Sequence, residues 1–304
     1  MIRYHFGYGG AEPGRRGKRL RPLLLLGVAQ VEGGRIADAL DAAVAIEVLH
    51  NYSLVHDDIE DGDELRHGRK TIWAQFGVAH GINAGDAMCA MAYLALLRNE
   101  TNLPQERLGA MLRVLHEANL KMCEGQGLDI SFETLASVTM ERYLAMIAGK
   151  TGALFAASCA LGALSAGAGE ARAQAWASLG RAYGRAFQIR DDVLGTWGAT
   201  NVTGKPSGAD VARRKWSFPI VWALGQPSSP DRDLVAHAYT LGANLDAEGV
   251  AAVIAALERL GAREAADTAY EAALQEAQDV AVRADIDAAG TIRGFFQQGA
   301  RRVA

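Results

Sequence analysis

The chain has 304 residues, of which 50% are hydrophobic and 22% charged, and this composition excludes an intrinsically disordered protein. Its 31 Lys and Arg against 35 Asp and Glu give a net charge of -4, which argues against nucleic-acid binding through bulk positive charge. The 3 Cys form no CxxC pair, so neither a disulfide framework nor a structural zinc site is expected. No signal-peptide pattern opens the chain, and we expect a reducing, cytoplasmic setting.

Long spans without proline predict one helix after another. Residues 23–103, 105–205 and 231–304 contain no proline and are rich in Ala and Leu. Apolar residues recur at helical spacing between Arg35 and Glu64, and no stretch shows the period of two that a sheet needs. No repeat or linker divides the chain. The sequence therefore predicts one all-α domain over residues 1–304.

The densest polar segment lies at the end of the helix predicted from residue 35. His56–Gly68 reads HDDIEDGDELRHG and places six acids in eight positions. On a helix Asp57 and Asp61 project from one face, one turn apart, and repel each other unless a cation lies between them. Oxygen ligands alone favour Mg²⁺ over zinc. Such a run is also typical of a solvated helix end, but the apolar residues before it, Ala45–Val55, favour the metal site.

A stretch without charge, Thr151–Gly169, raises the alternative of a membrane span. It consists mainly of Ala, Gly, Ser and Thr, whereas a lipid-facing helix is richer in large apolar residues. We therefore expect a helix packed closely inside the protein and no membrane span.

A second acidic pair, Asp191-Asp192, ends a similar helix in FQIRDDVLG. Two acidic helix ends in one bundle can face each other across a cavity. Basic residues accompany them: five lie within 15–21, others follow the first acidic run, and Lys205 and Lys215 lie in and beyond a glycine-rich loop. Because Mg²⁺ is commonly bound by a few carboxylates and phosphate oxygens, the set predicts a substrate with more than one diphosphate. Lys205 is not part of a P-loop, since the GxxxxGK[ST] pattern is missing.

Together these motifs resemble the trans-isoprenyl diphosphate synthases of the polyprenyl synthetase family. The resemblance rests on GKRLRP (17–22), DDIED (57–61), RHG (66–68), KT (150–151), FQIRDD (187–192), and TGKP with the later Lys215. It implies an antiparallel all-α bundle around a deep central cavity, a homodimer, and the Mg²⁺-dependent condensation of isopentenyl diphosphate with an allylic diphosphate.

The resemblance also assigns roles to single residues. It makes Asp57, Asp61 and Asp191 the Mg²⁺ ligands, supported by Asp58 and Asp192. It makes Lys18, Arg21 and His50 the binding residues for isopentenyl diphosphate. It gives the allylic diphosphate to Arg66, Lys150, Thr151, Gln188, Lys205 and Lys215. Lys150 and Lys205 count among the catalytic residues of this set.

Three positions depart from the family pattern. The usual tandem Arg pair reads Arg66-His67, which places a titratable imidazole where a diphosphate contact is expected. The binding of isopentenyl diphosphate then weakens above roughly pH 6.5 unless Arg69 or Lys70 compensates. Gly195 replaces the third Asp of the second motif. GKRLRP begins at residue 17, so we expect the usual first helix to be short or absent in this numbering.

Two residues beside the first motif bear on product length. Ser53 shares the face of Asp57 and is small, so nothing bulky blocks the space below it, whereas Tyr52 points to the side. In the family an aromatic residue at the position of Tyr52 limits the product. The combination resembles geranylgeranyl-forming enzymes and predicts a C20 product, with farnesyl (C15) second.

Two other functions remain open. A class I terpene cyclase shares the all-α fold and the acidic Mg²⁺ site, but it has no need for the isopentenyl diphosphate residues Lys18, Arg21 and His50. A non-catalytic subunit of a heteromeric synthase is expected to lose Mg²⁺ ligands, and here both Asp pairs are present.

Overall fold

The structure is a computed structural model that describes residues 1–8, 17–99, 103–198, 207–240 and 244–301, with the side chains of 297–301 left out. The structure is 77% helical, with almost no strand among the described residues, which confirms the all-α prediction. The described strands are β1 (Leu65–Arg66) and β2 (Arg69–Lys70), which form an antiparallel hairpin. Two-residue strands show no alternation that a sequence pattern can reveal, so this hairpin was not predicted. Lys205 lies outside the described residues.

Contacts divide the chain into two compact units, which are described separately. Unit 1 comprises Met1–Asn119 and Ala157–Gln174, and unit 2 comprises Leu120–Ala156 and Ala175–Ala304. Three helices contribute residues to both units: α6 (Gln105–Phe132), α8 (Ala153–Ser165) and α9 (Glu170–Trp197). The single domain predicted over residues 1–304 stays a prediction.

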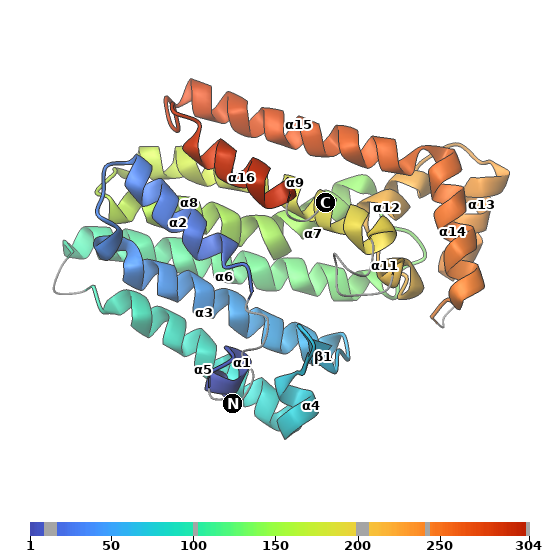
Figure 1. Cartoon of the computed structure of the whole chain (residues 1–304), viewed down its shortest axis with the longest axis horizontal. Helices are drawn as coiled ribbons and strands as arrows, with labels where there is room; N and C mark the ends of the chain where they lie inside the picture. The colour runs from blue at the N-terminus through green and yellow to red at the C-terminus, as the bar shows by residue number, and fades with distance from the viewer. Residues whose placement is uncertain (9–16, 100–102, 199–206, 241–243, 302–304) are drawn as a thin grey trace. The chain divides into compact units, whose positions relative to one another are not determined.

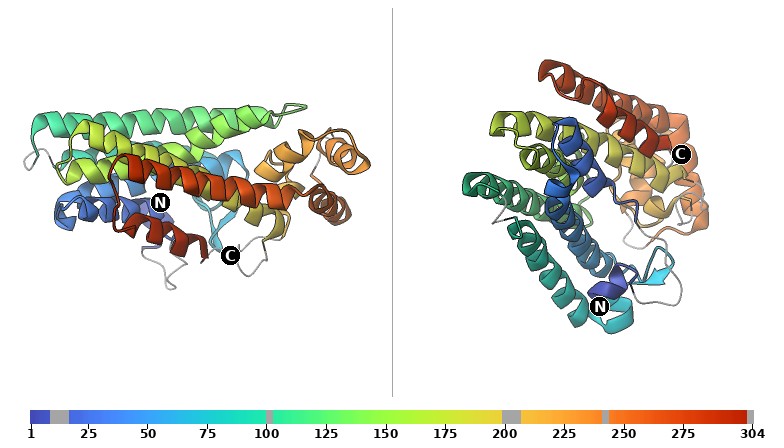
Figure 2. Two further views of the ribbon diagram at one scale, coloured as in Figure 1. Left: turned by 90° about the horizontal axis from the view of Figure 1, so that it is seen from above. Right: turned by 60° about the vertical axis from the view of Figure 1, so that its left-hand side comes forward.

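Unit 1 is built around one long helix. Its own elements, besides the hairpin, are α1 (Ile2–His5), α2 (Leu20–Val31), α3 (Ile36–Glu60), α4 (Ile72–Phe76) and α5 (Val78–Leu97). Helix α3 packs against α2 and α5, and Figures 1 and 2 show α3 and α5 side by side. Ala42, Ile46 and Leu49 of α3 are completely buried, as their helical spacing predicts. Helix α1 has four residues, and the expectation that the family's usual first helix is short or absent stays a prediction.

Small residues let the uncharged stretch pack closely. A Cβ atom at Gly162 of α8 would lie 2.4 Å from the carbonyl oxygen of Leu25 on α2, so the backbones of the two helices touch. The helical stretch Met140–Ser165 is long and apolar enough to cross a membrane, but 72% of its most apolar 18-residue window is buried inside the protein. Burial of this kind is the pattern of a core helix.

Unit 2 contains the remaining helices and a second core. They are α7 (Met140–Ile147), the π-helical turn η1 (Ala148–Gly152), α11 (Ala209–Ala212), α12 (Phe218–Leu224), α13 (Pro230–Thr240), α14 (Ala247–Leu260), α15 (Ala262–Arg283) and α16 (Thr291–Arg301). Helix α13 packs against α14, and α15 packs against α12. Trp216 lies in the core, where its indole nitrogen donates a 2.9 Å hydrogen bond to the carbonyl oxygen of Phe132.

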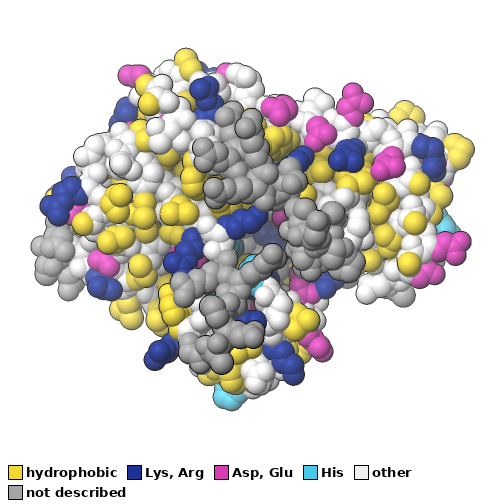
Figure 3. All heavy atoms as spheres, viewed as in Figure 1, with side chains coloured by type: hydrophobic (Ala, Val, Ile, Leu, Met, Phe, Trp, Pro, Cys, Tyr) yellow, Lys and Arg dark blue, Asp and Glu magenta, His cyan; other side chains and the backbone are white. Residues whose placement is uncertain are grey.

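Some large apolar side chains of unit 1 stay on the surface. Figure 3 shows hydrophobic side chains over α2, where Leu23 remains 48% exposed. Leu40 and Val44 lie one turn apart on α3 and are 48% and 45% exposed. On α5 the side chain of Leu94 is 63% exposed. Exposed apolar faces on neighbouring helices are typical of surfaces that bind another protein.

Candidate active site

The first acidic motif forms the C-terminal end of α3. Asp57 and Asp61 are half-buried and one turn apart, and the Asp61 amide donates to the Asp57 carbonyl oxygen at 2.8 Å. Carboxylates are unfavourable at a helix C-terminus, where the unpaired carbonyl groups already carry negative charge. A cation bound at this end of α3 therefore offsets two repulsions, that between the carboxylates and that with the helix dipole.

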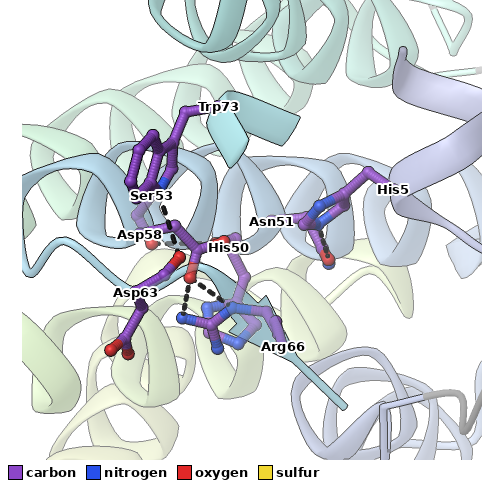
Figure 4. A network of polar contacts seen from close by, with 8 residues as sticks. All are labelled: His5, His50, Asn51, Ser53, Asp58, Asp63, Arg66 and Trp73. Atoms are coloured by element: carbon purple, nitrogen blue, oxygen red, sulfur yellow. Dashed lines mark hydrogen bonds and ion pairs between the residues drawn. The ribbon is translucent and has the colours of Figure 1, made fainter. Parts of the chain in front are cut away.

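Asp58, the second acid of the motif, is directed to a basic side chain instead. It is 2% exposed, and its Oδ1 accepts from Arg66 Nε at 2.8 Å and lies 2.7 Å from Arg66 Nη2 (Figure 4). Burial raises the pKa of Asp58, while the hydrogen bond and the charge of Arg66 lower it. Asp58 thus fixes the guanidinium of Arg66 beside the end of α3.

Arg66 belongs to the hairpin whose tip is His67. The tip residues His67 and Gly68 have φ angles of 53° and 79°, which is the conformation of a two-residue hairpin turn. Histidine adopts positive φ more readily than most residues, and this is a local reason for an imidazole at the tip. The base of the hairpin is closed by Thr71, whose amide donates to the Glu64 carbonyl oxygen at 2.9 Å.

The structure brings together two of the three residues predicted to bind isopentenyl diphosphate. Arg21 Nη1 and His50 Nε2 are 2.9 Å apart. Burial lowers the pKa of His50 well below its usual value, and the charges of Arg21 and Arg66 lower it further. His50 is therefore neutral and accepts the hydrogen bond from Arg21. Lys18 is exposed two residues before α2 begins.

The residues predicted to set product length lie one to two turns before Asp57. Ser53 is half-buried and its hydroxyl donates to the His50 carbonyl oxygen at 2.8 Å (Figure 4). Tyr52 is 6% exposed, and its hydroxyl donates to the side-chain oxygen of Asn119 on α6. Asn119 in turn donates to the Tyr93 hydroxyl on α5 at 3.0 Å. Tyr52 is thus held between α5 and α6 by a polar network that the sequence did not indicate.

In unit 2 the second acidic pair is split between surface and interior. Asp191 of α9 is exposed, whereas Asp192 is 6% exposed. Asp192 accepts hydrogen bonds from the Tyr143 hydroxyl at 2.6 Å, the Phe218 amide at 2.7 Å and the Gln188 side chain at 2.9 Å. Burial raises the pKa of Asp192 to about 7 although these hydrogen bonds oppose it. Asp192 therefore joins α9 to α7 and α12, and Asp191 is the acid of the pair that reaches solvent.

Lys150 and Thr151 both lie in the π-helical turn η1, a distortion often found at functional sites. Lys150 Nζ is 2.5 Å from Asp129 Oδ2 of α6, and the Thr151 hydroxyl donates to Gln188 Oε1 at 2.6 Å. Gln188 consequently links Thr151 to Asp192. Asp129 was missed in the sequence, because nothing in its neighbourhood indicates that Lys150 is its partner.

The missing third acid of the second motif leaves a space that another carboxylate fills. A Cβ atom at Gly195 would lie 1.8 Å from Oδ2 of Asp210, so the Asp210 side chain occupies the position where a larger residue would begin. Gly195 and Asp191 are four residues apart on α9 and share a face. Lys215 is half-buried, and its amide donates to the Asp210 carbonyl oxygen at 2.9 Å.

The oxygen donors fit Mg²⁺ by their chemistry. Among the described residues no group of three or more His, Cys, Asp and Glu side chains is placed to hold a metal ion. Mg²⁺ commonly takes only one or two carboxylates and completes its shell with water and phosphate oxygens. Unit 1 offers two such carboxylates, Asp57 and Asp61, and unit 2 offers one, Asp191. The prediction that the two acidic ends face each other across a cavity stays a prediction.

Known proteins place the chain in one family. Residues 12–257 match the family model described as Polyprenyl synthetase. A (2E,6E)-farnesyl diphosphate synthase of Mycobacterium bovis is 40% identical over 78% of this chain, which spans 66% of that relative. A geranylgeranyl diphosphate synthase of Mycobacterium tuberculosis is 38% identical over 94% of the chain and 83% of the relative.

A solved structure agrees with these relatives. The crystal structure of a polyprenyl synthetase from Streptomyces coelicolor superposes with a TM-score of 0.87 at 33% identity, covering 100% of this chain and 90% of that one. The resemblance drawn from the sequence motifs is thereby confirmed. The chain belongs to the polyprenyl synthetase family of trans-isoprenyl diphosphate synthases.

Proposed function

We propose that the chain is a prenyltransferase that condenses isopentenyl diphosphate head to tail (1′-4) with an allylic diphosphate, in a Mg²⁺-dependent reaction that yields a short all-trans polyprenyl diphosphate. The observation that carries the proposal is the end of α3, where Asp57 and Asp61 adjoin a guanidinium, that of Arg66, held by Asp58. This arrangement offers carboxylates to cations and a fixed cation to a diphosphate.

The chain's own residues have distinct tasks in this reaction. Mg²⁺ would be held by Asp57, Asp61 and Asp191, and when bound it neutralises charge on the departing diphosphate. His67 would contact isopentenyl diphosphate, and Arg66, Lys150, Thr151, Gln188, Lys205 and Lys215 would bind the allylic diphosphate. The contact between Asp129 and Lys150 supports this role, because it fixes the ammonium group in one place.

Lys18, Arg21 and His50 would bind isopentenyl diphosphate. The neutral state of His50 supports this assignment, because a neutral imidazole orients Arg21 without repelling it. The positive charge of Arg21 is then directed to the substrate's diphosphate. The apolar residues around α3 would keep water from the allylic cation before the double bond of isopentenyl diphosphate attacks it.

We assign the product as geranylgeranyl diphosphate (C20), with farnesyl diphosphate (C15) second. Tyr52 is a large side chain held by Asn119, whereas Ser53 beside it is small. Relatives of similar identity carry both names, farnesyl and geranylgeranyl diphosphate synthase, so the family alone does not decide the length.

We also propose a cytoplasmic homodimer. The apolar residues exposed on α3 and α5, among them Leu40, Val44 and Leu94, support a surface covered by a second copy. Sedimentation velocity at micromolar concentration tests the assembly; a monomer at that concentration contradicts it.

The decisive experiment incubates the purified chain with Mg²⁺, labelled isopentenyl diphosphate and each allylic starter (C5, C10, C15), and separates the dephosphorylated products by chromatography. A C20 alcohol is expected. Release of a hydrocarbon would favour the terpene cyclase, and absence of turnover without a second protein would favour the non-catalytic subunit. Asp57→Asn should abolish condensation, whereas the matched control Asp38→Asn, at the exposed start of α3, should not.

A further inference from the structure

The hairpin that carries Arg66 and His67 needs support from outside. Its strands have two residues each, and an isolated two-stranded hairpin is at best marginally stable in water. The first strand is held through Arg66 by Asp58. The loop before it is held by Trp73, whose indole nitrogen donates to the Asp63 carbonyl oxygen at 3.0 Å (Figure 4).

The second strand is held by one residue of the N-terminal helix α1. The Tyr4 hydroxyl donates to the Lys70 carbonyl oxygen at 2.9 Å. The guanidinium of Arg69 lies over the Tyr4 ring, 4.4 Å from its centroid, which is the geometry of a cation–π contact. The Tyr4 ring also packs edge to face with the ring of Phe76 on α4, and the two centroids are 5.4 Å apart. Tyr4 therefore touches both residues of β2 and the helix that follows the hairpin.

Helix α1 is itself attached to the helix that bears the acidic motif. Four residues are too few for a stable isolated helix, so α1 depends on its contacts. His5 Nε2 lies 2.9 Å from Asn51 Oδ1 of α3 (Figure 4). Because the Asn51 amide nitrogen donates to the Glu47 carbonyl oxygen at 2.8 Å, its oxygen is the acceptor for His5. Asn51 adjoins His50 in sequence.

From these contacts we propose that α1 is a brace, with Tyr4 and His5 as positioning residues that hold the hairpin against the acidic end of α3 and so set the affinity for a diphosphate. The proposal rests on the proposed function, because Arg66 and His67 are there the diphosphate-binding residues. His5 contacts α3 through Asn51, and Tyr4 contacts β2 through Lys70 and Arg69. Releasing either contact leaves the hairpin attached mainly through its first strand.

The test compares Tyr4→Ala, Tyr4→Phe and His5→Ala with the matched control Arg3→Ala, which alters an exposed side chain of the same helix. Tyr4→Ala should raise the KM for the allylic diphosphate about fivefold or more, with kcat within about twofold of the unaltered chain. Tyr4→Phe keeps the ring contacts and should show a smaller rise, and Arg3→Ala none. The double variant Tyr4→Ala/His5→Ala should add little to either single variant, because each releases the same brace.

Two further measurements do not depend on turnover. Hydrogen exchange at the hairpin amides, including that of Thr71, should quicken in Tyr4→Ala but not in Arg3→Ala. Binding of inorganic pyrophosphate, followed by calorimetry, should weaken in parallel. Unchanged exchange and unchanged pyrophosphate affinity in Tyr4→Ala would overturn the proposal, as would a fall in kcat at constant KM. If the unaltered chain fails to condense its substrates while these two effects appear, the proposed function fails and the brace stands.

Discussion

Gly125 and Gly127 offer a matched pair for testing how Lys150 is positioned. Both lie in α6, two residues apart, Gly125 buried and Gly127 exposed. An Ala Cβ at 125 would lie 2.1 Å from the backbone nitrogen of Lys150 and 2.7 Å from the Gly149 carbonyl carbon. An Ala Cβ at 127 meets no atom within 4 Å. Gly125→Ala therefore forces α6 and η1 apart, and Gly127→Ala does not.

The size of the effect follows from these distances. Carbon contacts are relaxed at roughly 3.5 Å, so the backbone around Lys150 must move by more than about 1 Å. Overpacking of this kind costs about 1–3 kcal/mol. Both variants gain about 1 kcal/mol because Ala favours the helix over Gly, and that gain cancels when the two are compared. The difference in the free energy of unfolding should thus be about 1–3 kcal/mol.

Calorimetry and kinetics check the two consequences. At about 2–4 °C for each kcal/mol in chains of 150–250 residues, Gly125→Ala should melt several degrees below Gly127→Ala. The displacement also disturbs the 2.5 Å contact between Lys150 and Asp129, so the KM for the allylic diphosphate should rise in Gly125→Ala alone. If both variants melt at the same raised temperature with unchanged KM, the close approach of α6 to η1 is refuted.

Three other substitutions test separate parts of the site. Tyr52→Ala should lengthen the product, at a cost of about 3–5 kcal/mol for the lost aromatic core side chain, whereas Tyr52→Phe should leave the product length unchanged. Chromatography of the dephosphorylated products checks this, and an unchanged length in Tyr52→Ala contradicts the assignment. Gly195→Asp should lower the melting temperature, because the new side chain displaces the Asp210 carboxylate. The double variant Gly195→Asp/Asp210→Ala should recover part of this loss. If the effects of the two substitutions on the melting temperature simply add, residues 195 and 210 do not compete for the same space. Asp58→Asn should raise the KM for the allylic diphosphate about tenfold, because it removes the ion pair that positions the Arg66 guanidinium. The control Asp38→Asn should leave the KM unchanged, and equal KM values in the two variants would contradict the role of Asp58.

The sequence predicted the elements that long-range regularity defines. Helix α3 was evident because its buried residues, such as Ala42 and Ile46, recur with the helical period up to the acidic motif. The burial of residues 153–165 followed from their small side chains. Family membership followed from motifs in a fixed order. These signals depend on the order and spacing of residues along the chain.

What the sequence missed depends on contacts between distant residues or on very short elements. Helix α1 and the strands of the hairpin are too short for a helical or strand period to repeat within them. The pairing of Asp129 with Lys150 joins residues 21 apart and has no local pattern. Asp191 and Asp192 look equivalent in sequence, yet packing of Tyr143 and Phe218 buries one of them. Adjacent residues on a helix face different directions, and only the tertiary structure decides which one reaches solvent.

The π-helical turn η1 has a consequence for how this chain tolerates length changes. A π-turn holds one residue more than an α-turn, so the residues after Gly152 are rotated by about 100° relative to an uninterrupted helix. Lys150 and Thr151 lie within this turn, and their side chains reach partners on two different helices, α6 and α9. Deleting a single residue such as Ala148 would therefore restore a regular helix and keep the buried face of the residues that follow in phase, whereas inserting one would not. Between Met140 and Ser165 the buried residues therefore follow one helical spacing before η1 and the same spacing, shifted by one residue, after it.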